Sequence, residues 1–489
     1  MGGSPDGVGR RVESGLRKTL INSTALFGGE TVSRLGGWLM AFIVAHRFGA
    51  AGLGQYAYAV AVTSVLLMFP DFGLHLAAIR DLSARPEKLR TTFWTLHWIK
   101  LPLVGALVSG VLVFGGVALR DEGRRALLYV LLARAVLMTF SQAYMAVFKA
   151  FERMHYIGLL QLANAVVVLI SVVAAWQLQA SLSSTVGCLV AGQAVETCGG
   201  WAVARSRFNT GEAYGCDSAL VRNLLIAAAP IGVTAILQAL NLRLDLLILS
   251  VFASNAELGR LQAADSFLLA AFLGASLSLG VVFPKMCRLL SRGSEEASLY
   301  VGNLLKHGTL LLAVVALAVS LGAPGLLRVL YGRELASAAD VLRLLAPAIP
   351  LMFINTLLVY VFFAAHLRSV YVGTLGLSVL LTTVLCFWLV PKYGAAGAAL
   401  ADLIRESVVA AVFLGHLQHH GLAYGATRAL LKVCPAVAVL AVLLAVIAPA
   451  AGSWPMWTAA CTALLFGGTL LLAGLPNRAE ILVVLGDYP

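Results

Sequence analysis

Long uninterrupted runs of hydrophobic residues dominate the chain, and short charged or Pro/Gly-rich segments separate them. The runs exceed about twenty residues, the length that an α-helix needs to cross the hydrocarbon core of a bilayer. A membrane β-barrel would instead show alternating segments of about ten residues. The pattern predicts about fourteen membrane-spanning helices. Their approximate ranges are 21–46, 55–79, 92–118, 126–149, 156–178, 183–204, 222–250, 259–283, 300–321, 340–365, 370–390, 394–416, 430–450 and 456–475.

Composition supports this interpretation of the hydrophobic runs. Hydrophobic residues make up 60% of the 489 residues, charged residues make up 12%, and the mean hydropathy is +0.89. Soluble domains are about 25% charged and have far more polar surface to present to water. We therefore expect an all-α polytopic membrane protein. The polar, basic segment 1–20 does not resemble a cleavable signal peptide, so the first run is expected to remain as a span.

The Lys and Arg residues indicate the orientation of the spans. If the N-terminus is cytoplasmic, the basic residues concentrate in the links on that side, from Arg10 and Arg11 at the start to Arg428 and Lys432 near the end. Cytoplasmic links are enriched in Lys and Arg, so an even number of spans with both termini in the cytoplasm is predicted. This bias accounts for most of the net charge of +12, and no nucleic-acid partner is needed to explain it.

The links on the outer side are short and leave no room for a catalytic domain. QLQAS (Gln177–Ser181) is one complete link. The sequence also lacks a DxD carboxylate pair, a P-loop and a GxSxG motif, which sugar-nucleotide enzymes, ATP-driven pumps and serine hydrolases would need. The chain is therefore not expected to be an enzyme.

Two short motifs recur along the chain and indicate an internal repeat. FKAFERMHYIG beginning at Phe148 resembles FFAAHLRSVYVG beginning at Phe362, and both lie at cytoplasmic links. Leu53-Gly54 likewise corresponds to Leu258-Gly259 at two outer links. A parallel repeat of this kind predicts two six-helix lobes related by a pseudo-two-fold axis along the membrane normal. The predicted divisions are a basic segment 1–20, an N-lobe 21–210, a C-lobe 211–420, and residues 421–489 with the last two spans and a short cytoplasmic tail.

Charged residues inside the predicted spans are the main candidates for function. A charge at the bilayer centre costs roughly 2.5–3.5 kcal/mol on insertion scales, whereas an exposed i,i+4 ion pair returns only about 0.2–0.5 kcal/mol. These groups should therefore face the bundle interior or a wet cavity. Glu30 and Arg34 in the first span could line such a cavity or form a salt bridge that docks two helices. Arg134 has no acid one helical turn away, so cavity lining is favoured there.

The span 222–250 carries a polar stripe. Thr234, Gln238, Asn241 and Asp245 are spaced 4, 3 and 4 residues apart, which places them on one face of a continuous helix. Arg243 would point away from this stripe, toward another contact or outward to the interface.

Several acidic residues remain as candidates for ion coupling or for structure. Asp71 lies in FPDFGL, where it could cap a helix break or couple an ion. Asp265 is a further acid inside a predicted span. Asp402, Arg405 and Glu406 lie at positions i, i+3 and i+4 and are expected to form a structural network. No catalytic residue and no metal site are predicted.

Four stretches resemble one known family. HRFGAAGLGQYAYAVAV, FPDFGLHLAAIRDL, FKAFERMHYIGLLQLANAVV and AAPIGVTAILQALNLRLDLLILSVFASNAELGRLQAAD are similar to the polysaccharide-transport (flippase) branch of the multidrug/oligosaccharidyl-lipid/polysaccharide (MOP) exporter superfamily. The individual motifs, LG-x-Y-A, DFGL and R-x-D, are loose, but the similarity covers nearly the whole chain in order. The second copy departs from the pattern, because Leu261 stands where the first has Tyr56.

The resemblance implies a transporter of fourteen helices, with two lobes and two C-terminal helices, in the bacterial inner membrane. Such a protein would move polyprenyl-diphosphate-linked oligosaccharide from the cytoplasmic to the outer leaflet by alternating access, for cell-surface polysaccharide biosynthesis. Its partners would include membrane lipids and the polysaccharide polymerase and export machinery. Its cavity would be basic, and a buried acid would bind H⁺ or Na⁺ as the coupling ion; no other cofactor is expected.

These arguments give two sets of candidate residues and two alternative functions. The cavity set is Arg34, Arg134, Arg243, Gln238 and Asn241, and the coupling or counter-ion set is Glu30, Asp71, Asp245 and Asp265. A cation-coupled multidrug exporter of the same superfamily is the first alternative, and it would favour an acidic, aromatic pocket over intramembrane arginines. An integral-membrane polysaccharide polymerase or glycosyltransferase is the second, and it would need larger outer loops.

Overall fold

The computed structural model describes residues 5–420 apart from 118, 209, 212–214, 216 and 292–294. Side chains are described at 28–29 and from 36 onward, except at these positions and at 291 and 295. The predicted division 421–489, with spans 430–450 and 456–475, lies outside the described residues, as do the side chains of Glu30 and Arg34.

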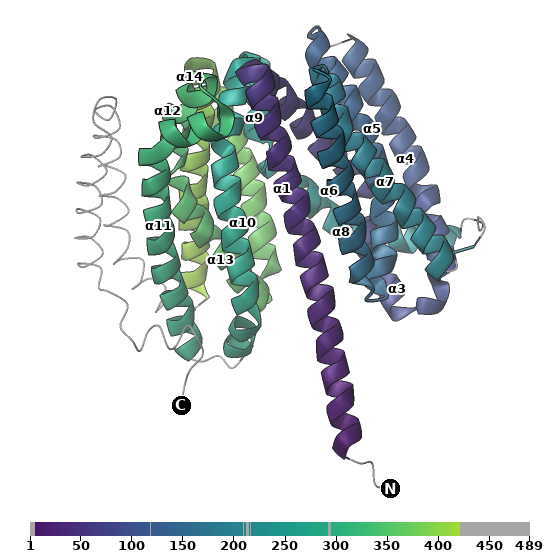
Figure 1. Cartoon of the computed structure of the whole chain (residues 1–489). Coiled ribbons are helices and arrows are strands. Elements are labelled where there is room, and N and C mark those ends of the chain that lie inside the picture. Colours follow the sequence, from purple (N-terminus) through teal and green to yellow (C-terminus); the bar gives the residue numbers. More distant parts are fainter. Residues whose placement is uncertain are drawn as a thin grey trace. The chain divides into compact units, whose positions relative to one another are not determined.

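All regular structure in the described residues is helical (Figure 1). The helices are α1 (Pro5–Leu66), α2 (Met68–Asp71), α3 (Leu74–Ala84), α4 (Leu89–Val117), α5 (Glu122–Ala150), α6 (Met154–Gln177), α7 (Leu182–Phe208), α8 (Ser218–Asn241), α9 (Leu244–Phe252), α10 (Asn255–Ser291), α11 (Glu295–Tyr331), α12 (Ala339–Leu345), α13 (Ala348–Ala364) and α14 (Arg368–His419), with 3₁₀ turns η1 (Pro86–Lys88) and η2 (Glu334–Ala338). Of the described helices, 8 are long and apolar enough to cross a membrane, or up to 9 if a pair bent by 51° counts as one span. The predicted all-α multi-pass fold is confirmed.

Two of the long helices each contain two predicted spans. Within α1 the chain turns at Gly49 (φ 66°), between predicted spans 21–46 and 55–79. Within α14 it turns at Gly394 (φ 56°), between 370–390 and 394–416. Both glycines begin the sequence Gly-Ala-Ala-Gly, and both adopt a left-handed conformation that other residues rarely enter. The described residues are thus compatible with the predicted fourteen spans.

Contacts divide the chain into two compact units. Unit 1 comprises Met1–Phe48 and Gln55–Leu240, and unit 2 comprises Gly49–Gly54 and Asn241–Pro489. In unit 1, α5 packs on α3, α4 and α7, and α6 packs on α7. In unit 2, α13 packs on α10, α11 and α14, and α9 packs on α14 (Figure 1). By its contacts α8 belongs to unit 1, whereas the predicted C-lobe begins at 211.

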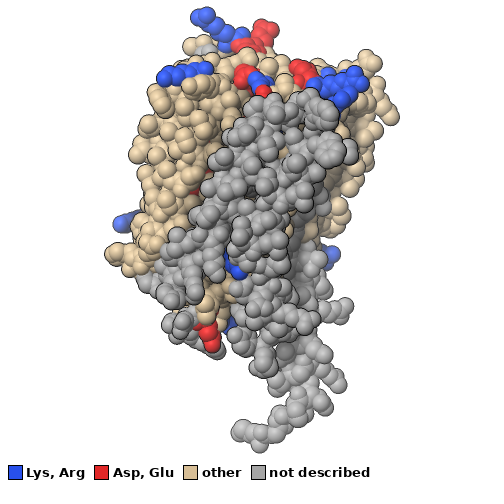
Figure 2. All heavy atoms as spheres, turned by 90° about the vertical axis from the view of Figure 1, so that its left-hand side faces the viewer, with Lys and Arg blue, Asp and Glu red and all other residues tan. Residues whose placement is uncertain are grey.

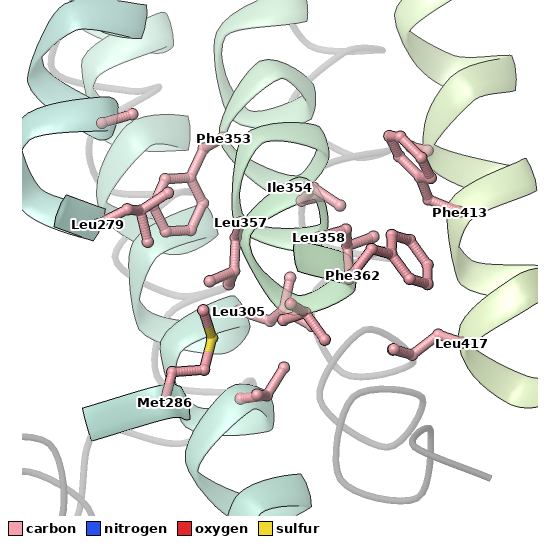
Figure 3. Packing of buried hydrophobic residues seen from close by; sticks show 14 of the residues in the cluster. Leu279, Met286, Leu305, Phe353, Ile354, Leu357, Leu358, Phe362, Phe413 and Leu417 are labelled. Carbon is pink, nitrogen blue, oxygen red and sulfur yellow. The ribbon is translucent and has the colours of Figure 1, made fainter. Parts of the chain in front are cut away.

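The interior of unit 2 is an apolar cluster centred on α13 (Figure 3). Phe353, Leu357 and Phe362 of α13 point toward Leu279 and Met286 of α10, Leu305 of α11, and Phe413 and Leu417 of α14. Outward-facing side chains are apolar too, as at Val281, which is 81% exposed. On the face drawn in Figure 2 most of the described surface is uncharged. A bundle that is apolar both inside and outside suits a lipid environment.

The predicted continuous helix over 222–250 is wrong. Helix α8 ends at Asn241 and α9 begins at Leu244, with Arg243 in a non-helical conformation (φ −138°, ψ −7°). The backbone carbonyl of Asn241 accepts a hydrogen bond from Arg405 Nη1 at 3.0 Å. This contact replaces a helical hydrogen bond with a tertiary one. Because of the break, the predicted stripe does not reach Asp245 along one helix.

Candidate functional site

A pocket opens within unit 1. Its polar lining comes from Arg134 on α5, Gln161 and Asn164 on α6, and Tyr56 on α1. Apolar residues of α1, α6 and α7 complete its wall, among them Met40, Ile43, Val168 and Leu189. One guanidinium and two amides therefore share a mainly apolar cavity, the usual composition of a small-molecule site.

Arg134 makes no hydrogen bond to another described residue. It interacts electrostatically with Glu196 of α7, and Glu196 Oε2 accepts a hydrogen bond from Asn164 Nδ2 at 2.5 Å. Glu196 is thus a counter-charge that interacts with the guanidinium without a hydrogen bond to it. The five N–H donors of an arginine form a planar fork that suits phosphate or carboxylate oxygens. This arrangement leaves Arg134 able to bind an anionic group.

Glycines shape the pocket on the α1 side. A Cβ at Gly36 or Gly37 would have no described atom within 4 Å, and both residues line the pocket. Gly29 is different, because a Cβ there would overlap the Gln161 side chain. The cavity roles of Arg34 and Glu30 stay predictions.

Unit 2 contains a cluster of three carboxylates, which we call the acid cluster: Asp245 on α9, Asp265 on α10 and Asp402 on α14. Their ligand atoms all lie within 4.8 Å of one another. Asp245 and Asp402 are 3% and 5% exposed. Asp245 Oδ2 has no hydrogen-bond partner among the described residues. Oxygen ligands so close together are the kind that a small cation binds.

Arg405 lies beside the acid cluster and belongs to the predicted structural network. Its Nη1 is 3.2 Å from Asp402 Oδ1, and its Nη2 donates to Glu406 Oε1 at 2.8 Å. Glu406 Oε2 also accepts from Asn355 Nδ2 at 2.6 Å. The network exists, and Asp402 belongs to both groups. The Arg405 guanidinium thus interacts with four carboxylates of unit 2.

The structure divides the predicted cavity set between the two units. Arg134 lines the unit 1 pocket. Gln238 is an exposed residue of α8 in unit 1. Asn241 belongs to unit 2, and its Oδ1 accepts a hydrogen bond from Ser378 Oγ at 2.5 Å. Arg243 interacts electrostatically with Asp245 and Asp265. The break after Asn241 removes the continuous helix on which the predicted direction of Arg243 depended.

Asp71 belongs to a different site in unit 1. It does not cap the helix break, since the N-terminus of α3 at Gly73 has no side-chain cap. Its carboxylate pairs instead with Lys100 Nζ at 2.9 Å and with His75 Nδ1 at 2.5 Å. Lys100 is fully buried, at 0% exposure.

The sequence interpretation missed Gln161 and Asn164 in the pocket and His75 beside Asp71. Gln161 and Asn164 are two polar residues three positions apart inside the apolar run 156–178. His75 follows Asp71 by four residues, one helical turn in a regular helix. These spacings can be recognised in the sequence, but the residues that these side chains contact follow only from the tertiary packing.

The fold of this chain is similar to the folds of several solved transporter structures. Lipid II flippase MurJ in its inward closed conformation matches with a TM-score of 0.68 at 15% identity, covering 92% of this chain and 100% of that one. An inward-facing MATE-family multidrug resistance transporter of the MOP superfamily matches with a TM-score of 0.61 at 12% identity, covering 81% and 94%. A MOP superfamily transporter from Pyrococcus furiosus, described as having a binding pocket of reverse polarity, matches at 0.55 and 14%, covering 84% and 95%.

The fold of this chain is that of MurJ and of the MATE-family transporters of the MOP superfamily. The family model described as "Polysaccharide biosynthesis protein" matches residues 19–290, more than half of the chain. The chain belongs to this family, in the polysaccharide-transport branch of the superfamily. No curated protein matches it. The alternative of a polymerase or glycosyltransferase stays a prediction from the sequence.

Proposed function

We propose that this protein is a flippase for polyprenyl-diphosphate-linked oligosaccharide, moving it from the cytoplasmic to the outer leaflet by alternating access. The observation that carries the proposal is the Arg134 pocket in a chain of the polysaccharide biosynthesis family. A guanidinium flanked by the amides of Gln161 and Asn164 offers donors to phosphate and sugar oxygens alike.

The chemistry of the substrate explains why such a pocket is needed. A diphosphate linked to a glycan is large, polar and anionic, so it cannot cross hydrocarbon unaided. A cavity with a positive charge and neutral amides stabilises the head group, while the polyprenyl tail stays in the lipid. The proposed setting is the bacterial inner membrane with both termini in the cytoplasm, beside the polysaccharide polymerase and export machinery.

The acid cluster supplies a candidate site for the coupling ion. If Asp245, Asp265, Asp402 and Glu406 are all ionised, their charge exceeds that of Arg405 and Arg243 together. A bound H⁺ or Na⁺ would reduce this excess of buried negative charge. Uptake and release of that cation would then favour different conformations, which is the requirement for coupling.

Leaflet sidedness in proteoliposomes tests the proposed substrate. Purified protein is reconstituted with a fluorescent lipid-linked oligosaccharide, and the outer-leaflet fraction is measured with an impermeant quencher. We expect translocation by the wild type, a loss of about tenfold or more in Arg134→Ala, and little change in Arg85→Ala, an exposed control. Equal rates in wild type and Arg134→Ala would reject the pocket assignment.

A separate experiment tests the coupling site. In the same vesicles, an imposed H⁺ or Na⁺ gradient should stimulate the wild type but not Asp402→Asn, while Asp340→Asn, which is largely exposed, should respond normally. Gradient stimulation that survives in Asp402→Asn and Asp245→Asn would remove the acid cluster from the coupling step.

A multidrug exporter remains the second candidate, because MATE-family transporters share the fold and the acid cluster could attract organic cations. The two functions separate in one assay. Vesicles that extrude cationic dyes but translocate no lipid-linked sugar would favour this candidate over the flippase.

A further inference from the structure

A second buried ionic group lies in unit 1, at a break in the helix that follows Gly49. The chain passes from α2 to α3 through two consecutive left-handed residues, Phe72 (φ 37°) and Gly73 (φ 77°). Asp71 ends α2, and His75 lies in the first turn of α3. Two of the three members of the ionic group therefore flank the break.

The third member, Lys100 of α4, fixes the group to its surroundings. Its Nζ donates to Asp71 Oδ1 at 2.9 Å and to the backbone carbonyl of Thr139 on α5 at 3.0 Å. The other carboxylate oxygen, Asp71 Oδ2, is 2.5 Å from His75 Nδ1. Each oxygen of Asp71 thus has its own partner.

Groups from α4, α5 and α8 lie beside this ionic group. From α4, His97 interacts electrostatically with Lys100, and its own Nδ1 donates to the Phe93 carbonyl at 2.8 Å. From α5 the facing group is the Thr139 carbonyl. From α8 the contacts are Ile231 and Gly232, which close on Phe72 and Gly73 so tightly that a Cβ at Gly73 would be 2.8 Å from the Cβ of Ile231. The three atoms nearest a Cβ at Gly73 belong to Ile231 and Gly232, and none of them is titratable.

We propose that His75, Asp71 and Lys100 form a proton-binding site in unit 1, at which His75 takes up and releases the proton. Lys100 balances the charge of Asp71, so a neutral His75 gives a neutral group and a protonated His75 gives a net charge of +1. The buried ammonium of Lys100 opposes binding of a metal cation, which distinguishes this site from the acid cluster. The side chain of His75 is 28% exposed, whereas those of Asp71 and Lys100 are 6% and 0% exposed, so His75 is the member of the group nearest the surface of unit 1.

The position of the site gives the proton a structural consequence. Histidine is the side chain that ordinarily changes charge between about pH 5 and 8. The added charge strengthens the attraction of the Asp71 carboxylate to His75 on α3, relative to its attraction to Lys100 on α4. The left-handed residues Phe72 and Gly73 lie between Asp71 and His75. The change in charge therefore alters the interaction between the two side chains that flank the helix break. This inference goes beyond the proposed function and requires no substrate.

Hydrogen exchange measured by mass spectrometry tests the site directly. Deuterium exchange at the C2 position of histidine, followed from pH 5 to 8.5 on the full chain in lipid nanodiscs, reports the protonation of each histidine separately. We expect a titration curve for His75 whose midpoint shifts by about one pH unit or more in Asp71→Asn and does not shift in Asp402→Asn. A His75 curve without a midpoint in this range, or one unchanged in Asp71→Asn, would overturn the proposal.

Backbone amide exchange tests the consequence in the same samples. After correction for intrinsic rates, the segment 67–76 should change protection with pH in the wild type and in His46→Gln, an exposed control. In His75→Gln that dependence should be lost, while protection at one fixed pH shows that the fold is kept. Identical pH dependence in wild type and His75→Gln would indicate a purely structural ion pair. Since neither measurement uses lipid-linked sugar, failure of the flippase assay would leave both results interpretable.

Discussion

Glu196 interacts electrostatically with Arg134, which lines the pocket of unit 1. Glu196 is held by Asn164 and interacts with the guanidinium, so it competes with any anion that Arg134 binds. Replacing Glu196 with Gln keeps the shape and removes the charge. We expect the variant to bind a polyprenyl diphosphate roughly fivefold more tightly, for a change of about 1 kcal/mol.

The measurement is a binding titration of purified variant with the diphosphate lipid at two salt concentrations. Glu152→Gln, an exposed change at the α5–α6 link, is the matched control and should bind like the wild type. Unchanged or weaker binding by Glu196→Gln would mean that Glu196 does not oppose the anion.

Lys100 gives a second prediction at the residue scale, on stability. Removing one partner of a buried ion pair leaves the other charge uncompensated, at a cost of about 3–5 kcal/mol. Lys100→Met should therefore lower the melting temperature of the detergent-purified protein strongly. The double variant Lys100→Met with Asp71→Leu should recover much of the loss, since no unpaired charge remains. Additive losses in the double variant would contradict this account.

The residues illustrate what the sequence could and could not predict. Charges inside apolar runs identified Arg134, Asp71, Asp245 and Asp265 as groups that interact with other polar residues of the bundle, because exposure of a charge to lipid is so costly. The partners could not be identified, since Asp402 is far from Asp245 in the chain and reaches it only through the packing of α14 on α9. Periodicity describes one helix and carries no information about which helix lies opposite.

At the scale of elements, glycines decide where helices can approach. Gly54 and Gly259, the two positions matched by the repeat, meet within unit 2: a Cβ on Gly54 would overlap the Asn255 carbonyl, and a Cβ on Gly259 would overlap that of Ala50. Gly54→Ala should therefore cost about 1–3 kcal/mol through overpacking. Thermal unfolding would measure the loss against Gly105→Ala, which meets nothing within 4 Å. Equal melting temperatures would mean that the contact is not tightly packed in solution.

Breaks inside helices were harder to predict than the helices themselves. Pro70 and Gly73 signalled the α2–α3 break, and glycines signalled the turns in α1 and α14. The α8–α9 break falls in Asn241-Leu242-Arg243, which contains neither Pro nor Gly. Its stabilising contacts come from Arg405 and Ser378 on α14, so local sequence could not reveal it.

At the scale of the whole molecule, the two units differ in their buried chemistry. Unit 1 holds a pocket with a guanidinium and an ionic group balanced by Lys100, whereas unit 2 holds acids in excess of Arg405. The sequence repeat predicted two similar bundles, and hydropathy predicted their class. Neither the repeat nor the hydropathy predicted this difference in buried charge, because equivalent helices of the two bundles can keep their packing while their polar residues differ.

The orientation of the chain is the last prediction at this scale, and it depends on charge alone. Links enriched in Lys and Arg stay in the cytoplasm, which places the α5–α6 link inside and the start of α5 outside. After replacement of the seven native cysteines by Ser, single cysteines are introduced at Glu152 and at Glu122, which is 88% exposed. In intact cells an impermeant maleimide should label Glu122→Cys and spare Glu152→Cys until the membrane is opened. The reverse pattern would invert the topology, and with it the direction of substrate movement that we propose.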